Sequence, residues 1–306
     1  MSEYHYLKNR LLYALLLCVL SLCSGATHAT PTQVGAETPI YYSQKEFRYD
    51  YYHALLKQAL KVTDADYGTA NPQPYQPDSA EITESRGLVL LQQKHIDVVF
   101  LATTQEREQL YRPVLIPLDK GLLGLRVLLI KEKSQSRFDQ LHNAEELRQK
   151  MIGGFNPHWG DYQIYQENGF NQLSATKYEN LFKMLSSGRF DFFSRGLIEV
   201  WSELEKFRPL YPDLRVENRF AFYYNFPVYF FVHKDNAKLA ERLAEGLQRI
   251  QANGAFDALF QSYYGDDIAR ANLAQRQIIL LSTPSVASGR SPIKPFWWPA
   301  GTPFLQ

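Results

Sequence analysis

Residues 178–200 read YENLFKMLSSGRFDFFSRGLIEV and carry the signals of helix, turn, strand and helix in succession. Apolar residues at helical spacing predict the first helix: Tyr178, Leu181, Phe182 and Leu185. Gly188 ends it, because glycine enters a left-handed cap at little cost. Residues 189–193 predict a short strand, and Ser194 is expected to cap a helix over residues 197–207. This alternation indicates an α/β protein.

Three residues, Ser194, Arg195 and Gly196, follow the predicted strand. In open α/β sheets, ligands bind at the carboxyl ends of strands. The planar fork of Arg195 suits a carboxylate or a phosphate. The alternative is that Arg195 pairs with a structural Asp or Glu, and position alone does not separate the two interpretations.

A second junction follows the continuous apolar run at residues 96–101, which predicts a buried strand. Thr103, Thr104 and Arg107 come directly after it and form a candidate small-anion site. Alternatively, Thr104 only caps a short helix at residues 105–111, and Arg107 is solvated.

Two further strand ends contribute candidate ligand-binding residues. A strand at residues 151–155 leads to Trp159 and Asp161, where an aromatic ring can stack on a ligand. Alternatively, Trp159 packs half-buried and Asp161 is a favourable charge in the first turn of a helix at residues 162–168. The first predicted strand, residues 39–42, ends in Tyr42.

The remaining elements alternate in the same way. We expect helices at residues 47–62, 81–93, 144–150, 234–251, 255–264 and 266–277, a loop at 69–77, and strands at 214–218, 220–232 and 278–281. Pro227 must interrupt the aromatic run at 220–232, because proline cannot continue a central strand.

The amino-terminal segment indicates export. Lys8 and Arg10 precede an apolar run at residues 11–22, and small residues allow cleavage after Ala29. Both cysteines, Cys18 and Cys23, lie in this segment, so a mature chain would have no disulfide and no thiol nucleophile. Cleavage would leave equal numbers of acidic and basic residues, which argues against nucleic acid or an anionic membrane surface as partner. The sequence shows no metal-ligand spacing, phosphate loop or nucleophile elbow, so no cofactor is expected.

The order of these pieces resembles the type II periplasmic solute-binding proteins, and is most similar to the amino-acid-binding-like family with a transporter-type substrate-binding domain. The matching segments include GLVLLQQKHIDVVFLATTQER, GLLGLRVLLI, HWGDYQIYQENGF and FPVYFFVHKDNAKLAERLAEGLQRIQANGAFDALFQSYYG. The resemblance implies a two-lobed α/β fold with two crossing segments, near residues 124–127 and 218–227. Lobe one would comprise residues 30–123 and 228–282, and lobe two would lie within residues 124–227. A signal peptide (1–29) and a proline-rich tail (283–306) would flank them.

The resemblance also implies a function: capture of a small solute between the lobes for an ABC-type transporter or a sensor, in the periplasm of a Gram-negative type of envelope. We expect a monomer without nucleic-acid partners. The implied ligand-binding residues are Tyr42, Thr103, Thr104, Arg107, Trp159, Asp161, Ser194 and Arg195.

One departure from the family pattern bears on the ligand. Family members that bind α-amino acids carry an aspartate after the strand that matches residues 190–193, whereas this chain has Ser194, Arg195 and Gly196. We therefore expect a polar or anionic solute rather than a standard amino acid. Two alternatives stay open: a dehydratase-like enzyme on the same fold, with Glu199 and His158 as its candidate acid and base, and a protein-interaction derivative that does not serve transport.

Overall fold

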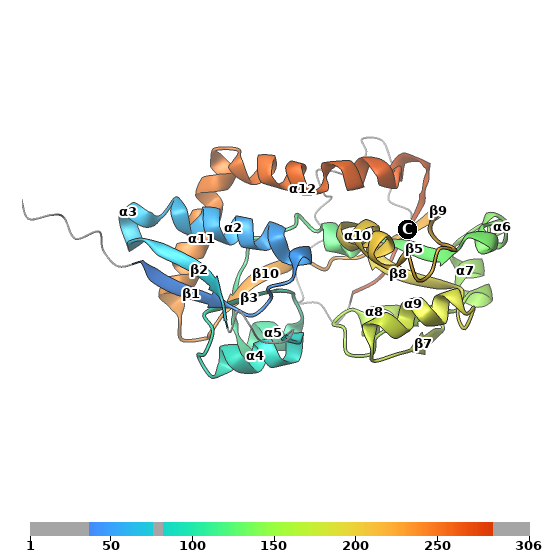
Figure 1. Cartoon of the computed structure of the whole chain (residues 1–306), viewed down its shortest axis with the longest axis horizontal. Helices are drawn as coiled ribbons and strands as arrows, with labels where there is room; N and C mark the ends of the chain where they lie inside the picture. Colours follow the sequence, from blue (N-terminus) through green and yellow to red (C-terminus); the bar gives the residue numbers. More distant parts are fainter. Residues whose placement is uncertain (1–36, 76–81, 284–306) are drawn as a thin grey trace, which may run out of the picture. The chain divides into compact units, whose positions relative to one another are not determined.

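The computed structural model describes residues 37–75 and 82–283, and the predicted export signal and almost all of the proline-rich tail lie outside them. The described chain forms two α/β lobes, each built on one β-sheet (Figure 1). The predicted α/β class is confirmed.

The first lobe is built on a five-stranded sheet with the order β2-β1-β3-β10-β4. Its strands are β1 (Thr38–Tyr42), β2 (Ala70–Pro74), β3 (Val98–Ala102), β4 (Arg112–Val114) and β10 (Val228–Val232). The helical segments of this part of the chain are η1 (Phe47–Tyr49), α2 (Asp50–Lys61), α3 (Asp64–Tyr67), α4 (Glu84–Gln92), α5 (Gln105–Leu110) and α11 (Ala237–Ala252). β10 follows the strands of the second lobe in the chain, so the chain re-enters this sheet through β10. This strand runs antiparallel to β3 and β4.

Strand β2 corrects the predicted loop at residues 69–77. It pairs in parallel with β1, with Pro72 opposite Ile40 and Pro74 opposite Tyr42. β2 is an edge strand, where a proline without a donor costs no ladder hydrogen bond on the open side. The prolines therefore mark an edge strand rather than a loop.

The second lobe is built on a six-stranded sheet with the order β11-β9-β5-β8-β6-β7. Its strands are β5 (Leu125–Lys131), β6 (Gly153–Phe155), β7 (Gln172–Ser174), β8 (Phe192–Gly196), β9 (Leu214–Tyr223) and β11 (Gln277–Leu280). The helical segments are η2 (Leu122–Gly124), η3 (Glu132–Ser134), α6 (Gln135–Asp139), α7 (Ala144–Lys150), α8 (Tyr162–Glu167), α9 (Tyr178–Ser186) and α10 (Leu197–Phe207). Helix α9 and the left-handed Gly188 that follows it (φ 70°) confirm the first half of the segment at residues 178–200.

Strand β8 differs from the predicted strand at residues 189–193. It begins at Phe192 and continues to Gly196, because β5 supplies partners for the whole run, including Val127 opposite Arg195. Ser194 therefore lies inside the strand, and Gly196 occupies the N-cap position of α10. The expectation that Ser194 caps the helix was wrong.

Two segments cross between the lobes side by side. The backbone N–H of Tyr224 donates to the carbonyl of Gly124 at 3.1 Å. A Cβ atom at Gly124 would overlap the Tyr224 carbonyl, so only glycine allows this close approach. Strand β9 ends at Tyr223 and β10 begins at Val228, which confirms the interruption predicted from Pro227.

The carboxyl-terminal part makes a third connection. The predicted helices at 255–264 and 266–277 form one helix, α12 (Ala255–Ala271), which the short turn η4 (Leu273–Gln275) joins to β11. β11 pairs in parallel with β9, so residues 277–280 belong to the second sheet and not to lobe one as predicted. Gly265 is accommodated within α12 because tertiary contacts outweigh its weak helix propensity.

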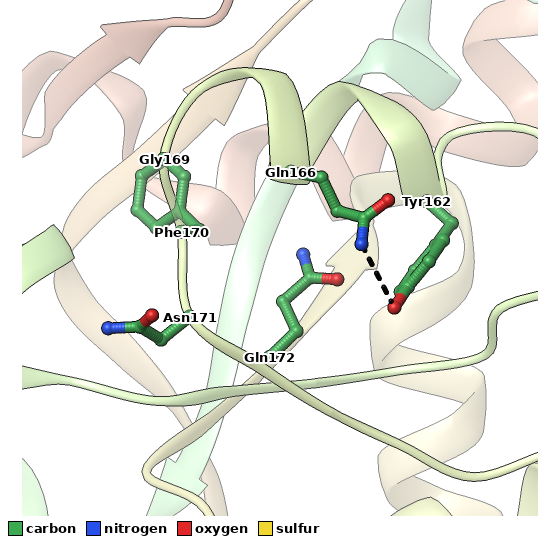
Figure 2. Close-up of a pocket in the computed structure, with 6 residues that line it drawn as sticks. All are labelled: Tyr162, Gln166, Gly169, Phe170, Asn171 and Gln172. Carbon is green, nitrogen blue, oxygen red and sulfur yellow. Dashed lines mark hydrogen bonds between the residues drawn. The ribbon is translucent and has the colours of Figure 1, made fainter.

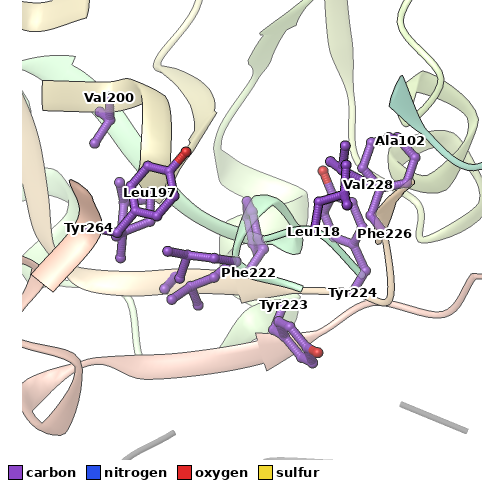
Figure 3. Close-up of a cluster of buried hydrophobic side chains, with 14 of the residues drawn as sticks. Ala102, Leu118, Leu197, Val200, Phe222, Tyr223, Tyr224, Phe226, Val228 and Tyr264 are labelled. Atoms are coloured by element: carbon purple, nitrogen blue, oxygen red, sulfur yellow. The ribbon is translucent and has the colours of Figure 1, made fainter. Parts of the chain in front are cut away.

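The contacts of α12 involve both lobes. The ring of Tyr264 lies 4.8 Å from that of Tyr51 on α2. Further along the helix, the guanidinium of Arg270 lies 4.1 Å from the ring centre of Trp201 on α10. Figure 3 shows part of the buried core, to which α12 contributes Tyr264, α10 contributes Leu197, and the second crossing contributes Tyr224 and Phe226.

Candidate functional site

A cavity of about 760 Å³ lies between the lobes. The first lobe lines it with residues of α4 and α5, and the second with the turn after β6 and with α8. Its lining includes Glu84, Ser85, Thr104, Gln105, Glu106, Arg107, Tyr111, His158, Trp159, Gly160, Tyr162, Gln163 and Gln166. The volume is within the range of about 300–1,000 Å³ that is usual for small-molecule sites.

Trp159, a predicted ligand-binding residue, forms part of the second-lobe wall. Its ring is stacked at 6.0 Å on Phe193 and meets Phe155 edge-on at 5.5 Å, so the core of the second lobe supports it from behind. The next residue, Gly160, allows the first lobe to approach: a Cβ there would lie 3.3 Å from Thr104. The cavity thus contains a supported aromatic surface opposite α5.

Arg107 and Thr104 form the first-lobe wall. The Thr104 hydroxyl accepts a hydrogen bond from the Arg107 backbone N–H at 3.2 Å, which caps α5. The Arg107 guanidinium donates to the Ala102 carbonyl at 2.6 Å and forms an ion pair with Glu84. The Glu84 side chain is 41% exposed, whereas that of Arg107 is 11% exposed.

Arg195 does not line this cavity. It is buried and donates to Glu203 from Nε at 2.7 Å and from Nη2 at 2.6 Å. A second carboxylate, Glu199, lies 3.1 Å from Nη2. Burial opposes the charge, but both carboxylates hold the pKa of Arg195 well above its ordinary value. Arg195 therefore has the structural pairing that the sequence left open as the alternative.

The Arg195 guanidinium also lies against the cavity wall. Its carbon lies 4.7 Å from the centre of the Trp159 ring and 5.0 Å from that of Phe193. Cation–π contacts of this length stabilise the ring position. Arg195 thus acts on the cavity through Trp159.

Asp161 belongs to the same buried network. It lies 3.3 Å from Nη2 of Arg126 and accepts a hydrogen bond from the Tyr224 hydroxyl at 2.5 Å. Arg126 also lies 3.7 Å from Glu199, which joins the two halves of the network. The chain of charges therefore runs Asp161, Arg126, Glu199, Arg195, Glu203, with Tyr178 donating to Glu203 at 2.7 Å.

Glu199 is the most exposed member of this network, with 31% of its side chain accessible. Burial raises the pKa of Glu199, but Arg195, Arg126 and the backbone N–H of Gly196 together hold that pKa below its ordinary value. Glu199 is therefore a paired carboxylate at neutral pH. A carboxylate in this state is a poor proton donor, and it is not positioned in the cavity lining with His158.

The other predicted site residues lie away from the cavity lining. Tyr42 is stacked on His53 at 4.5 Å, and the buried Thr103 hydroxyl donates to Glu108 at 2.7 Å. Ser194 is buried and bonds with the Tyr165 hydroxyl at 2.5 Å. The structure therefore brings Thr104, Arg107 and Trp159 together around one cavity and uses the remaining five residues in packing and pairing.

The residues that sequence reasoning missed include Glu84 of the cavity lining and Arg126 and Glu203 of the buried network behind it. Glu203 had a local signal, because Glu199 and Glu203 lie four residues apart on α10 and Arg195 immediately precedes that helix in β8. Glu84 and Arg126 had none, since their partners are distant in the sequence.

The described residues, 37–75 and 82–283, contain no group of histidine, cysteine and carboxylate side chains able to hold a metal ion. Across the same residues, every helix falls short of the length and apolar character that a membrane span requires.

No protein-family description and no curated protein matches this chain. Solved structures do resemble it. A periplasmic binding protein of Salmonella typhimurium with high arginine specificity has 16% identity and a TM-score of 0.53, over 75% of this chain and 100% of that one. An ancestral arginine-binding protein has 16% identity and a TM-score of 0.52, over 75% and 98% of the two chains.

A histidine kinase sensor domain with similarity to periplasmic binding proteins has 13% identity and a TM-score of 0.51, over 75% of this chain and 96% of that one. These likenesses confirm the predicted fold, the two-lobed type II fold of periplasmic binding proteins.

Proposed function

We propose that this chain is a non-enzymatic solute-binding protein that captures a small polar or anionic molecule between its two lobes. The solute would then pass to an ABC-type transporter or be reported to a sensor. The observation that carries the proposal is the cavity of about 760 Å³ lined by both lobes. A fold with two crossing segments allows the lobes to close around such a ligand.

Charge at the cavity supports a polar or anionic solute with a flat part. Arg107 is the arginine in the cavity lining. Its ion-pair partner Glu84 can give way to a solute carboxylate, because 41% of the Glu84 side chain is exposed. A solute carboxylate could replace Glu84 and keep the guanidinium paired. Trp159 offers a ring on which an aromatic or planar group can stack.

The argument against a standard amino acid changes with the structure. It rested on the missing aspartate at residues 194–196 and on the repulsion that an uncompensated Arg195 would exert on a ligand ammonium. Glu203 and Glu199 compensate the Arg195 charge, so only the missing aspartate still argues against an amino acid. Amino acids therefore belong in the set of ligands to be tested, together with the arginine that two of the similar structures bind.

Export and assembly are part of the proposal. The segment at residues 1–29 supports an extracytoplasmic location, and we propose that the mature protein acts as a monomer with a membrane permease or a sensor as partner.

The test is native mass spectrometry of the exported protein, followed by calorimetry with the compound that co-purifies. The expected result is a bound small molecule whose affinity falls on Trp159→Ala. Chemical turnover of that compound would favour an enzyme, and the absence of binding to any compound in a broad solute panel would contradict the proposal.

A further inference from the structure

The proline-rich tail leaves the described part of the chain beside the interlobe cavity. The Ser282 N–H donates to Oδ1 of Asn168 at 2.9 Å, and Nδ2 of Asn168 donates to the Ser282 carbonyl at 2.9 Å. Asn168 is the C-cap residue of α8, and Gln166, two residues earlier, lines the cavity. We propose that residues 292–304 of the tail bind in this cavity of the same molecule and compete there with the solute. The competition rests on the proposed function, whereas the docking of the tail does not.

A surface depression leads from Asn168 toward the cavity. Figure 2 shows it beside α8, where Gln166 donates to the Tyr162 hydroxyl at 3.3 Å. Its volume is about 370 Å³, and it adjoins the interlobe cavity because Tyr162 and Gln166 line both. From Thr283 to Phe296 an extended chain spans up to about 40 Å. The tail is therefore long enough to pass along α8 and enter the cavity.

The lining of the cavity suits a proline-rich segment. Residues 292–304 read PIKPFWWPAGTPF. Proline fixes φ, so such a segment loses less conformational freedom on binding than an ordinary one. Proline-rich segments bind in grooves lined by aromatic side chains. Tyr111, Trp159 and Tyr162 line the interlobe cavity together with Pro157, which gives the cavity this character.

The first-lobe wall also presents uncovered apolar surface. Leu110, the last residue of α5, lines the cavity together with Leu88 and is 49% exposed. Removing apolar surface from water favours association. Trp297 and Trp298 bring large apolar rings that could cover this surface. The exposed Leu110 side chain is thus a specific contact point for the tail.

The charges of the two surfaces are complementary. The tail contains Arg290 and Lys294 and no acidic residue. The cavity lining has two carboxylates, Glu84 and Glu106, and one guanidinium, that of Arg107. Opposite charges steer two surfaces together, and salt weakens the effect. The basic residues of the tail therefore favour this cavity.

A tethered segment needs only a weak affinity to occupy the cavity. A short linker gives an effective concentration on the order of 1 mM. If the free segment binds with a Kd of about 0.1 mM, the tail fills the cavity in about nine molecules of ten. The apparent affinity for a solute then falls about tenfold, because only the remaining molecules can bind it.

The test of docking uses a synthetic peptide of residues 284–306 and the complete mature protein, freed of co-purified solute by dialysis. The double variant Trp297→Ala with Trp298→Ala should release the cavity from its own tail. Calorimetry should then show the peptide binding to this variant with a Kd of about 0.1 mM. The unaltered chain should bind the peptide about tenfold more weakly, since its own tail competes.

A matched pair of substitutions locates the docking surface. Leu210, in the turn after α10, is 68% exposed and lines neither the cavity nor the depression beside α8. In the tryptophan double variant, adding Leu110→Asp should weaken peptide binding at least about tenfold, because it places a charge on the apolar wall. Adding Leu210→Asp should leave peptide binding unchanged. Melting temperatures check that both proteins fold.

Three results would overturn the docking proposal: equal peptide binding by the unaltered chain and the tryptophan double variant, no peptide binding by either, and equal effects of the two aspartate substitutions. Sedimentation gives a further check. A dimer of the unaltered chain that dissociates in the tryptophan double variant would show that the tail binds a second copy, and it would also overturn the proposal.

The competition is tested separately with the co-purified compound. It should bind the tryptophan double variant about tenfold more tightly than it binds the unaltered chain. Equal affinities would refute the competition even if the peptide docks. If no solute binds to either protein, the proposed function fails, and the peptide titration still decides whether the tail docks.

Discussion

Glu203 holds Arg195 in a bidentate ion pair, with Nε at 2.7 Å and Nη2 at 2.6 Å from its two carboxylate oxygens. The pair is buried behind the Trp159 ring, and the Tyr178 hydroxyl donates a hydrogen bond to Glu203. The sequence suggested Arg195 as a ligand-binding residue because it lies at the end of a strand. In the structure, Arg195 instead supports the aromatic wall of the cavity.

Glu203→Gln is expected to destabilise the fold strongly. Removing one partner of a buried ion pair leaves an uncompensated charge and typically costs about 3–5 kcal/mol. Here Glu199 still faces Arg195, so we expect the lower end, about 3 kcal/mol, in the free energy of urea unfolding. The double variant Arg195→Met with Glu203→Leu should lose less than Glu203→Gln alone. A double variant that loses more would show that the pair is a net source of stability.

Arg107 and Glu84 should have opposite effects on an anionic solute. Arg107→Ala removes a charged hydrogen-bond donor, and we expect a loss of about 1.5–3 kcal/mol in binding of the co-purified compound. Glu84→Gln removes the internal competitor for the same guanidinium and should raise the affinity. Calorimetry on both variants checks this, and a loss of affinity in Glu84→Gln would show that Glu84 itself contacts the solute.

Asp119 should make stability depend on pH. Burial raises the pKa of Asp119 to about 6, although the N–H groups of Gly121 and Leu123 oppose the rise. The folded state then holds a proton between about pH 4 and pH 6 that the unfolded chain has released, so stability falls as the pH rises through this window. The full loss above pH 6 is on the order of 3 kcal/mol.

The measurement for Asp119 is the unfolding free energy between pH 4 and pH 8. Asp119→Asn should reduce the slope of the curve in this window. Burial also raises the pKa of Asp267 to about 6, so Asp267→Asn measures the share of the slope that comes from Asp267. If only the Asp267 variant flattens the curve, the assignment to Asp119 fails.

Arg276 is expected to secure the third connection. Its buried guanidinium donates to three backbone carbonyls, those of Ala271, Glu217 and Phe220. Arg276→Met leaves these carbonyls unpaired, and at about 1–3 kcal/mol for each buried unsatisfied group the loss should exceed about 2 kcal/mol. Hydrogen exchange should be faster in β11 than in β6 of the variant, whereas equal acceleration in both strands would indicate a global effect.

Local patterns predicted much of the fold. The helix predicted at residues 234–251 is α11, and Asn236 caps it with a side chain that accepts from the Leu239 N–H at 3.3 Å. Gly188 and Pro227 lie where the sequence placed them, at the end of α9 and between β9 and β10. Gly188 and Pro227 act through their own backbone geometry, and Asn236 acts on a neighbour three residues away, which is why sequence alone can indicate them.

The failures arise where distant partners decide the outcome. β2 forms because β1 offers an edge, and β8 extends to Gly196 because β5 runs alongside it. In the same way, Arg195 looked available because Glu203 is brought to it only when α10 packs on the sheet. Pairing across the fold cannot be read from periodicity.

The connection through α12 and β11 bears on how solute uptake would be regulated. Two adjacent crossing segments act as a simple hinge, whereas a helix that contacts both Tyr51 and Trp201 adds a third connection and should restrain rotation of one lobe against the other. The resting protein should therefore sample a narrow range of opening angles, so less ordering entropy would be lost when a solute arrives. Substitutions on α12 would then change solute affinity, although α12 contributes no residue to the cavity lining.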